Sequence, residues 1–465
     1  MIGGPLLLIA APLAAAIVTF LLRRFRTAAA LIAALVALAL AVLALSAGES
    51  LGEPQDILGR RIALSGGDRI GLAFLFVASA AIFVGVWRSS PGWSYYPLVL
   101  LMLGALAAAL IVRPPLNEIY PSFVYSALFL AIAAALAVFP LQGGRPGITG
   151  GALRFITLMS LALPALLMAD WSLSQLGQSP DSPELKQATT SLVALGFALL
   201  LAVVPFHTWL PTVAREAPPL STAFILNVLL GAAVLLLADV LDGIRLIGGE
   251  PATLELLRGA GLLMAGVGGL LAWAQADFGR LLGYAALADM GAILFGVGLA
   301  SSAGLAAAFV TLIVRSIGIG LMAMGRTLAR ERLGDDSFAT LSGLVWRLPW
   351  AALAIVAGGL SLAGLPPLAG FAGRWGLVQA AGSLDPRAAA VFLLASASVA
   401  LGVLRGLREM LHARDSDAAS PPNERRSEAL LILAALALCV LIGLFPGALT
   451  QLVREFTAAY AFAGG

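Results

Sequence analysis

The chain has 465 residues, of which 60% are hydrophobic and 11% are charged, and its mean hydropathy is +0.98. Such a composition excludes a soluble domain of this length and predicts a membrane protein with many spans. The net charge of +3 is too small to suggest nucleic acid binding, and the single cysteine, Cys439, excludes a disulfide framework and a cysteine-ligated cluster.

Apolar stretches of roughly 20 residues are long enough to cross a bilayer as helices, and the sequence holds about fourteen of them. In chain order they cover residues 4–22, 27–47, 69–87, 94–112, 120–140, 153–173, 188–211, 218–240, 255–275, 281–300, 303–325, 349–381, 388–409 and 428–447. The first stretch is followed by arginines and a second span without a small-residue cleavage site, which favours a retained helix over a signal peptide.

The distribution of arginines predicts the orientation of these spans. An even number of spans places both termini on the same side of the membrane. Lys and Arg are more frequent in the loops and helix ends that share a side with Arg23, Arg24 and Arg26. The positive-inside rule makes that side cytoplasmic and puts both termini on the outer side of a prokaryotic cytoplasmic (inner) membrane. The arginine-bearing loops 326–347 and 405–427 are then cytoplasmic, and neither has the apolar content of an extra folded domain.

Two of the spans are too long and too interrupted to be simple helices. Residues 188–211 contain Pro205 and Pro211, and residues 349–381 contain Gly364-Leu365-Pro366-Pro367. These spans are the seventh and the twelfth in the chain. Each span reverses the direction in which the chain crosses the membrane, so two helices that are five spans apart run in opposite directions. Corresponding broken helices in two inverted halves point to a transport site, whereas a single proline often only kinks a membrane helix.

The predicted fold is therefore an all-α polytopic membrane protein with two inverted five-helix repeats and broken helices 7 and 12. Its parts are residues 1–92 with helices 1 to 3, residues 93–242 with the first repeat, residues 253–411 with the second repeat, and residues 412–465 with a cytoplasmic loop and helix 14.

Four motifs inside this region resemble those of one family. They are Pro205-Phe206-His207-Thr208-Trp209-Leu210-Pro211 with Glu216-Ala217-Pro218; Gln275, Asp277, Arg280-Leu281-Leu282 and Tyr284 ahead of Met290-Gly291; Leu341-Ser342-Gly343-Leu344 with Pro349; and Leu360 to Gly373. They are similar to motifs of the antiporter-like membrane subunits of respiratory complex I, membrane-bound hydrogenases and multisubunit cation/proton antiporters. The resemblance covers roughly residues 93–411. The short stretch after Gly447 favours the shorter members, such as subunits M and N of NADH-quinone oxidoreductase or the D-type subunits of the antiporters.

The resemblance implies a non-catalytic membrane subunit that carries protons or cations through half-channels lined by buried ionisable side chains. Its implied partners are the lipid bilayer, other membrane subunits, and soluble redox subunits reached through the assembly. No cofactor or metal is expected in this chain, because it has no glycine-rich phosphate loop and no paired His/Cys spacing. Any redox reaction then belongs to partner subunits.

The first half of the chain departs from the family pattern. The fifth-helix glutamate of the family falls near Ser122 to Val124, where no acid stands. The seventh-helix lysine falls on Leu200, and the eighth-helix lysine falls on Gly231. We therefore expect a degenerate first half-channel.

Three ionisable residues lie inside the second repeat, namely Asp289, Arg315 and Arg374. Asp289 and Arg315 fall near mid-bilayer on adjacent antiparallel helices, an arrangement that would let them pair. Arg374 follows Phe371 by three residues, where the family carries a twelfth-helix lysine or glutamate. Because a guanidinium does not deprotonate in a protein, arginine there provides a fixed positive field beside Asp289. The alternative is a structural cluster of buried ion pairs.

His207 lies at the first helix break and is a candidate proton relay, or else it bridges backbone groups freed by the break. Three functions stay open. The chain is a conducting subunit of a complex I-type or hydrogenase-type assembly, a non-conducting scaffold of such a complex, or a subunit of a non-redox ion or inorganic-carbon transporter with the same fold.

Overall fold

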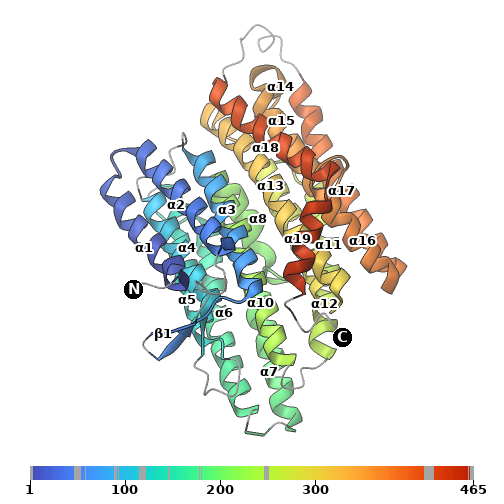
Figure 1. Ribbon diagram of the computed structural model, residues 1–465. Helices are drawn as coiled ribbons and strands as arrows, with labels where there is room; N and C mark the ends of the chain where they lie inside the picture. The colour runs from blue at the N-terminus through green and yellow to red at the C-terminus, as the bar shows by residue number, and fades with distance from the viewer. Residues whose placement is uncertain are drawn as a thin grey trace. The chain divides into compact units, whose positions relative to one another are not determined.

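The fold of the chain is given by a computed structural model, shown as ribbons in Figure 1. The structure describes residues 4–46, 54–57, 59–87, 89, 92, 94–114, 122–144, 147–176, 178–179, 181–245, 251–412, 424–458 and 460. Most of the predicted cytoplasmic loop before helix 14, residues 413–423, lies outside the described residues.

The chain forms two compact units. Unit 1 comprises Met1–Phe206, Asn227–Leu256 and Phe456–Gly465. It contains α1 (Gly4–Leu21), α2 (Arg26–Ser46), β1 (Gln55–Ile57), β2 (Arg60–Ile62), α3 (Gly66–Val86), α4 (Tyr95–Ile111), β3 (Val112–Arg113), α5 (Val124–Gln142), α6 (Gly150–Leu176), α7 (Pro183–Leu200) and α10 (Leu230–Arg245).

Unit 2 comprises His207–Leu226 and Leu257–Glu455. It contains α8 (Trp209–Glu216), α9 (Pro219–Phe224), α12 (Phe278–Gly298), α13 (Ser302–Leu333), α14 (Leu344–Arg347), α15 (Pro349–Leu362), α16 (Gly370–Leu384), α17 (Pro386–Leu411) and α18 (Arg426–Leu444). The unit borders fall within the 3-10 turn η1 (Phe206–Thr208), the π-helical turn η2 (Ile225–Leu229), α11 (Pro251–Trp273) and α19 (Gly447–Thr457).

The helices have the length and composition of membrane spans. Among the described residues, eleven helices are long and apolar enough to cross a bilayer, and α4 and α15 are shorter apolar helices. The prediction of a helical membrane protein is thus confirmed. The two interrupted spans are also broken as predicted, because α7 ends at Leu200 before α8 begins at Trp209, and α15 ends at Leu362 before α16 begins at Gly370.

Unit 1 also carries a small sheet that the sequence analysis did not predict. Its strands pair antiparallel in the order β1-β2-β3, with Gln55 opposite Ile62 and Arg61 opposite Arg113. Strand β3 directly continues the end of α4. The strands are only two or three residues long, too short for a clear alternating pattern.

Local sequence explains where many helices begin. Ser65 and Asp68 form a reciprocal capping box at the start of α3, and the side chain of Asp277 accepts a hydrogen bond from the Arg280 N–H at the start of α12. Prolines stand in the first turns of α7, α9, α15 and α17, where a missing N–H costs no helical hydrogen bond.

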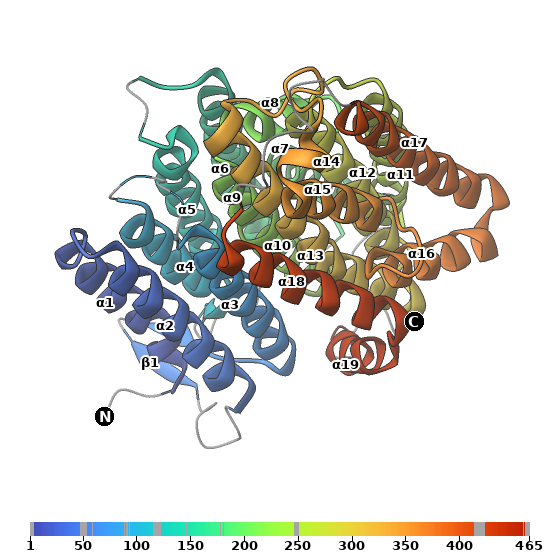
Figure 2. The same ribbon diagram turned by 90° about the horizontal axis from the view of Figure 1, so that it is seen from above.

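Helix α12 lies at the centre of unit 2, and all of its residues are buried apart from Arg280 and Tyr284. It packs against α8, α13, α16 and α17. Glycines allow its closest approaches, because a Cβ at Gly283 would lie 2.5 Å from the Cα of Pro211 in α8. Figure 2 shows α13, α15 and α17 of the same unit side by side.

Two predicted loop boundaries are wrong. The region 326–347 is not a loop from its start, because α13 continues to Leu333, and α17 likewise continues to Leu411 inside the predicted loop 405–427. In α13 the reason is that Arg326, which hydropathy alone excludes from a span, is fully buried and paired within the protein.

Candidate functional site

The candidate site of unit 2 is centred on Asp289 in the middle of α12. Its side chain is 3% exposed. Counting residues at the helical rise places it about 16 Å from the start of α12 and about 14 Å from its end. An acid at this depth of a membrane helix is retained where it pairs or takes part in ion movement.

The partner of Asp289 is Arg374 near the start of α16. An Nη2 of Arg374 donates to Oδ1 of Asp289, and the same atom lies 3.2 Å from the carbonyl oxygen of Leu362 at the end of α15. The helix break therefore supplies both the arginine and a carbonyl that has lost its helical partner. The guanidinium bridges the two halves of the broken helix and fixes them against α12.

Gly364 makes this arrangement possible. Its φ is +75°, and a Cβ at this position would lie 2.7 Å from the Cβ of Arg374 and 2.8 Å from its Cγ. A glycine is needed for the backbone conformation and for the passage of the arginine side chain. Gly364 thus has a specific role in placing Arg374.

Arg315 of α13 completes the cluster, but not as predicted. It is 2% exposed, and its Nη2 donates to the carbonyl oxygen of Leu226 at 2.8 Å. Leu226 belongs to the π-helical turn η2, a distortion common at functional sites. Arg315 interacts electrostatically with Asp289 without an ion-pair contact between the two described residues. The pairing of Asp289 with Arg315 that the sequence allows is not formed between these two described residues, since the break carries Arg374 to the carboxylate instead.

The cluster holds one carboxylate and two guanidiniums. Nε and Nη1 of Arg315 and Nη1 of Arg374 are buried and have no protein acceptor among the described residues. Only Asp289 can change its protonation state, because arginine stays charged in proteins. Chemically, the arrangement is one titratable acid within a buried positive field.

His207 lies in η1 and is half-buried. Its ring packs on that of Tyr284 in α12, with centroids 6.4 Å apart. Within the described part of the chain, none of the three cluster residues hydrogen-bonds or pairs with His207. The structure therefore brings together three of the four predicted site residues and leaves His207 at the first break.

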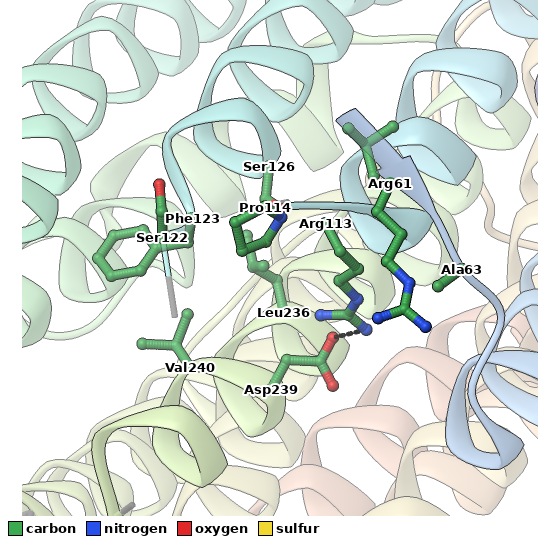
Figure 3. A pocket seen from close by; sticks show the side chains of 11 residues that line it. Arg61, Ala63, Arg113, Pro114, Ser122, Phe123, Ser126, Leu236, Asp239 and Val240 are labelled. Carbon is green, nitrogen blue, oxygen red and sulfur yellow. Dashed lines mark hydrogen bonds and ion pairs between the residues drawn. The ribbon is translucent and has the colours of Figure 1, made fainter. Parts of the chain in front are cut away.

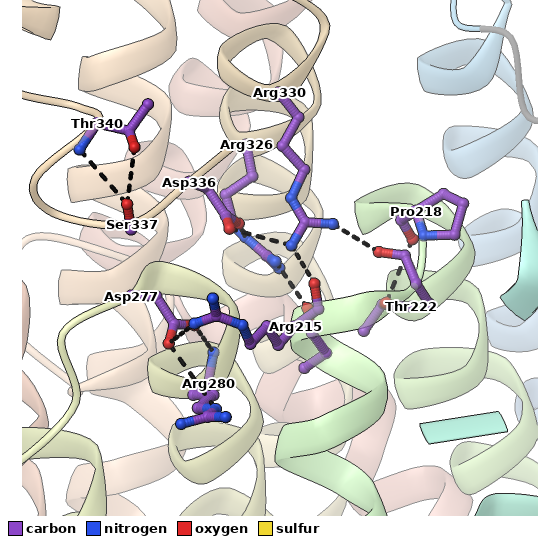
Figure 4. A network of polar contacts seen from close by, with 12 residues as sticks. Arg215, Pro218, Thr222, Asp277, Arg280, Arg326, Arg330, Asp336, Ser337 and Thr340 are labelled. Carbon is purple, nitrogen blue, oxygen red and sulfur yellow. Dashed lines mark hydrogen bonds and ion pairs between the residues drawn. The ribbon is translucent and has the colours of Figure 1, made fainter. Parts of the chain in front are cut away.

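A second polar network of unit 2 lies where the end of α8, the start of α12, the last turns of α13 and the segment after α13 meet (Figure 4). Arg326 and Asp336 are both fully buried and pair at 2.6 Å, and Arg330 pairs with the other oxygen of Asp336 at 3.0 Å. Both arginines also donate to carbonyl oxygens at the end of α8, including Ala214 and Ala217. They stabilise the end of the helix that follows the first break.

The charges of this network change the pKa of Asp336, a residue that lies outside the membrane-spanning helices. Burial alone raises the pKa of its carboxyl, but Arg326 and Arg330 lower the pKa by more, so that it stays below its usual value. Arg215 and Asp277 extend the network with a 2.6 Å ion pair. Sequence reasoning missed this site because its arginines were assigned to a solvated loop. The spacing of Arg326 and Arg330, one helical turn apart, was the available signal.

In unit 1, the two positions at which the family resemblance implies lysines lie among apolar side chains. Leu200 is 5% exposed at the end of α7. A Cβ at Gly231 of α10 would meet the side chains of Leu75 at 3.2 Å and Phe74 at 3.4 Å. Neither position offers a side chain that binds a proton.

Unit 1 nevertheless has a polar cluster that the sequence analysis did not predict (Figure 3). Arg113 of β3 binds Asp68 in the first turn of α3 at 2.9 Å and Asp239 inside α10 at 3.0 Å. A cavity of about 280 Å³ beside it is lined by Arg61, Ser122 and apolar side chains, among others. Hydropathy alone assigns Asp239 to the end of a helix and Arg113 to a turn beside Pro114-Pro115, and their pairing joins residues that are 126 positions apart in the chain.

Comparison with known proteins places these features in context. The family described as NADH:quinone oxidoreductase/Mrp antiporter, TM, matches residues 147–400. NADH-quinone oxidoreductase subunit N of Cereibacter sphaeroides is 30% identical over 443 residues, and the alignment covers 93% of each chain. Three further subunit N proteins align over shorter stretches that cover 64%, 55% and 56% of their own lengths.

Solved structures share the fold at lower identity. A chain of the archaeal membrane-bound sulfane sulfur reductase, a respiratory membrane complex, matches with a TM-score of 0.83 and 19% identity over 99% of this chain and 98% of that one. A chain of the Mrp complex from Dietzia sp. DQ12-45-1b matches with a TM-score of 0.81 and 21% identity over 98% of this chain and 96% of that one. Both similar chains come from complexes.

Proposed function

Because this chain belongs to the NADH:quinone oxidoreductase/Mrp antiporter transmembrane family, we propose that it translocates protons or cations as a subunit of a multisubunit, redox-driven membrane complex. The name of its relative in Cereibacter sphaeroides supports a complex of the NADH-quinone oxidoreductase type. Its partners are then further membrane subunits, with soluble redox subunits reached through them. The membrane is the cytoplasmic membrane of a prokaryote, with both termini on the outer side.

The observation that carries the proposal is the ion pair between Asp289 and Arg374 at the helix break. A proton that binds Asp289 neutralises the carboxylate and removes its attraction to Arg374. The arginine then keeps its bond to the carbonyl of Leu362, and its charge favours release of the proton again. Arg315 acts from α13 as a fixed positive charge, and His207 serves as a relay near the first break.

This conduction belongs to the second half of the chain. The apolar surroundings of Leu200 and Gly231 support a degenerate first half-channel. The proposal includes fourteen crossings in two inverted repeats, residues 93–242 and 253–411, each with one broken helix. Residues 1–92 precede the repeats as three further helices.

A non-conducting scaffold is the second candidate. It is favoured by the replacement of the twelfth-helix lysine or glutamate by Arg374, since a guanidinium cannot pass a proton. In that case the buried cluster only holds α12, α13 and α16 together.

The two candidates are separated by measuring ion movement in the assembled complex reconstituted in vesicles. If the second half conducts, Asp289→Asn and Arg374→Ala reduce proton uptake, reported by a pH-sensitive dye, while assembly and redox turnover persist. Arg280→Gln is the matched control, because the Arg280 side chain is 52% exposed at the start of the same helix as Asp289. Unchanged uptake in both variants, with the subunit assembled, would establish the scaffold.

A further inference from the structure

The buried cluster of unit 2 carries more positive than negative charge. Asp289 supplies one negative charge, and Arg315 and Arg374 supply two positive charges, all at 5% exposure or less. The nearest further charge on α13 among the described residues is Arg326, eleven residues and about 16 Å along the helix from Arg315. Among the described residues of α12, α13 and α16 around the cluster, one buried positive charge thus has no compensating acid, an arrangement that is costly in a membrane interior.

The same arginines have hydrogen-bond donors to spare. Each guanidinium has five N–H groups, and the carbonyls of Leu226 and Leu362 with the carboxylate of Asp289 accept only some of them. The nitrogens Nε and Nη1 of Arg315 and Nη1 of Arg374 are buried without a protein acceptor among the described residues. Buried donors require a partner, and charged donors prefer an anionic one.

The backbone around the cluster adds to the positive field. α16 begins at the break, with Arg374 in its second turn, so the positive end of this helix lies beside the cluster. Half-helix N-termini of broken membrane helices bind anionic groups in transporters. α13 and α16 also approach closely, because a Cβ at Gly373 would lie 2.6 Å from Oγ1 of Thr311. Arg315 is one turn beyond Thr311 on α13. Arg374 reaches Asp289 from α16, and the same carboxylate also interacts electrostatically with Arg315, so both arginines lie around one carboxylate.

We infer that a small monovalent inorganic anion of the halide class binds between Arg315 and Arg374. One such anion balances the extra charge and accepts hydrogen bonds from the spare donors. The close packing of α12, α13 and α16 favours a monatomic ion over a phosphate or a carboxylate metabolite. The site does not require that the chain conduct protons, so a failure of either proposal leaves the other standing.

Removing a positive charge and removing the negative charge should have opposite effects on anion binding. Arg315→Gln removes a positive charge and the spare donors, so it abolishes anion binding. Asp289→Asn leaves both arginines uncompensated, so it strengthens binding. A purely structural cluster would be weakened by both changes without any dependence on the anion.

The experiment measures the thermal stability of the purified full-length chain in detergent, in sodium chloride and in sodium gluconate at the same ionic strength. Binding to the folded state raises the melting temperature once chloride exceeds the dissociation constant, and the rise then grows with the logarithm of the chloride concentration. The wild type and Arg280→Gln show this rise, Arg315→Gln lacks it, and in Asp289→Asn the rise begins at a lower chloride concentration. Should Arg315→Gln not fold, Arg315→Lys keeps the charge and requires about tenfold more chloride, as expected for one lost charge-assisted hydrogen bond.

Crystals grown in sodium bromide give a direct second readout. The expected result is an anomalous bromide peak beside the guanidiniums of Arg315 and Arg374. Equal melting temperatures in chloride and gluconate, a chloride effect that survives in Arg315→Gln, or density for water alone at the spare donors would each overturn the inference.

Discussion

Replacing Gly364 by alanine is expected to destabilise the helix break and to displace Arg374. Gly364 has a φ of +75°, a conformation that an alanine adopts only at a cost. The new methyl group would also lie 2.7 Å from the Cβ of Arg374, an atom close to the backbone that cannot move away alone. The start of α16 has to shift, and the contact between Arg374 and Asp289 shifts with it.

The size of the effect follows from these two contributions. A left-handed conformation costs a non-glycine residue about 1–2 kcal/mol. Overpacking of a filled interior costs about 1–3 kcal/mol more. The free energy of unfolding should therefore fall by about 2–5 kcal/mol in Gly364→Ala.

Gly320→Ala is the matched control for this measurement. Gly320 lies inside α13, and a Cβ there meets no atom within 4 Å. Since alanine favours a helix interior over glycine, this variant should gain about 0.5–1 kcal/mol. Both variants are compared with the wild type by equilibrium unfolding in mixed micelles of mild detergent and SDS. A Gly364→Ala variant as stable as the wild type would refute the assigned role of Gly364.

Two further predictions concern the other ion-pair networks. Asp336→Asn leaves the fully buried Arg326 without its charged partner and should cost about 3–5 kcal/mol in the same assay. The pKa of Asp336 is lowered in the folded state. The ionised carboxylate therefore contributes to the free energy of unfolding at any pH above its pKa in the unfolded chain, about 3.9. This contribution is lost as the pH falls through the pKa of the folded state. The Asn variant should lack this acid loss, and an unchanged pH profile would contradict the assignment. Arg113→Met removes the cation that pairs with both Asp68 and Asp239 and should cost about 2 kcal/mol. This is below the range for full burial because the Arg113 side chain is 31% exposed. Stability equal to that of the wild type would show that the cluster of unit 1 is solvated.

Hydropathy and proline spacing predicted the positions of the helices well. Length and apolar content decide whether a segment spans a membrane, and both are local properties of the sequence. The two helix breaks were also predictable. Pro205 and Pro366 have no backbone N–H to donate, and this holds whatever packs around them in the folded protein. Prediction failed at the end of α13, where hydropathy assigns Arg326 to a loop and tertiary contacts bury it.

The sequence by itself determined the membrane class of this protein, its broken helices, its family motifs and the residue types of its buried cluster. Only the tertiary structure decided which of these residues form ion pairs and hydrogen bonds with one another. Asp289 and Arg374 are 85 residues apart, and Arg315 and Leu226 are 89 residues apart. Helical periodicity relates residues a few positions apart along one helix. The partner of a buried charge depends on which helices meet, and in unit 2 the break places the start of α16, rather than α13, against the carboxylate of α12.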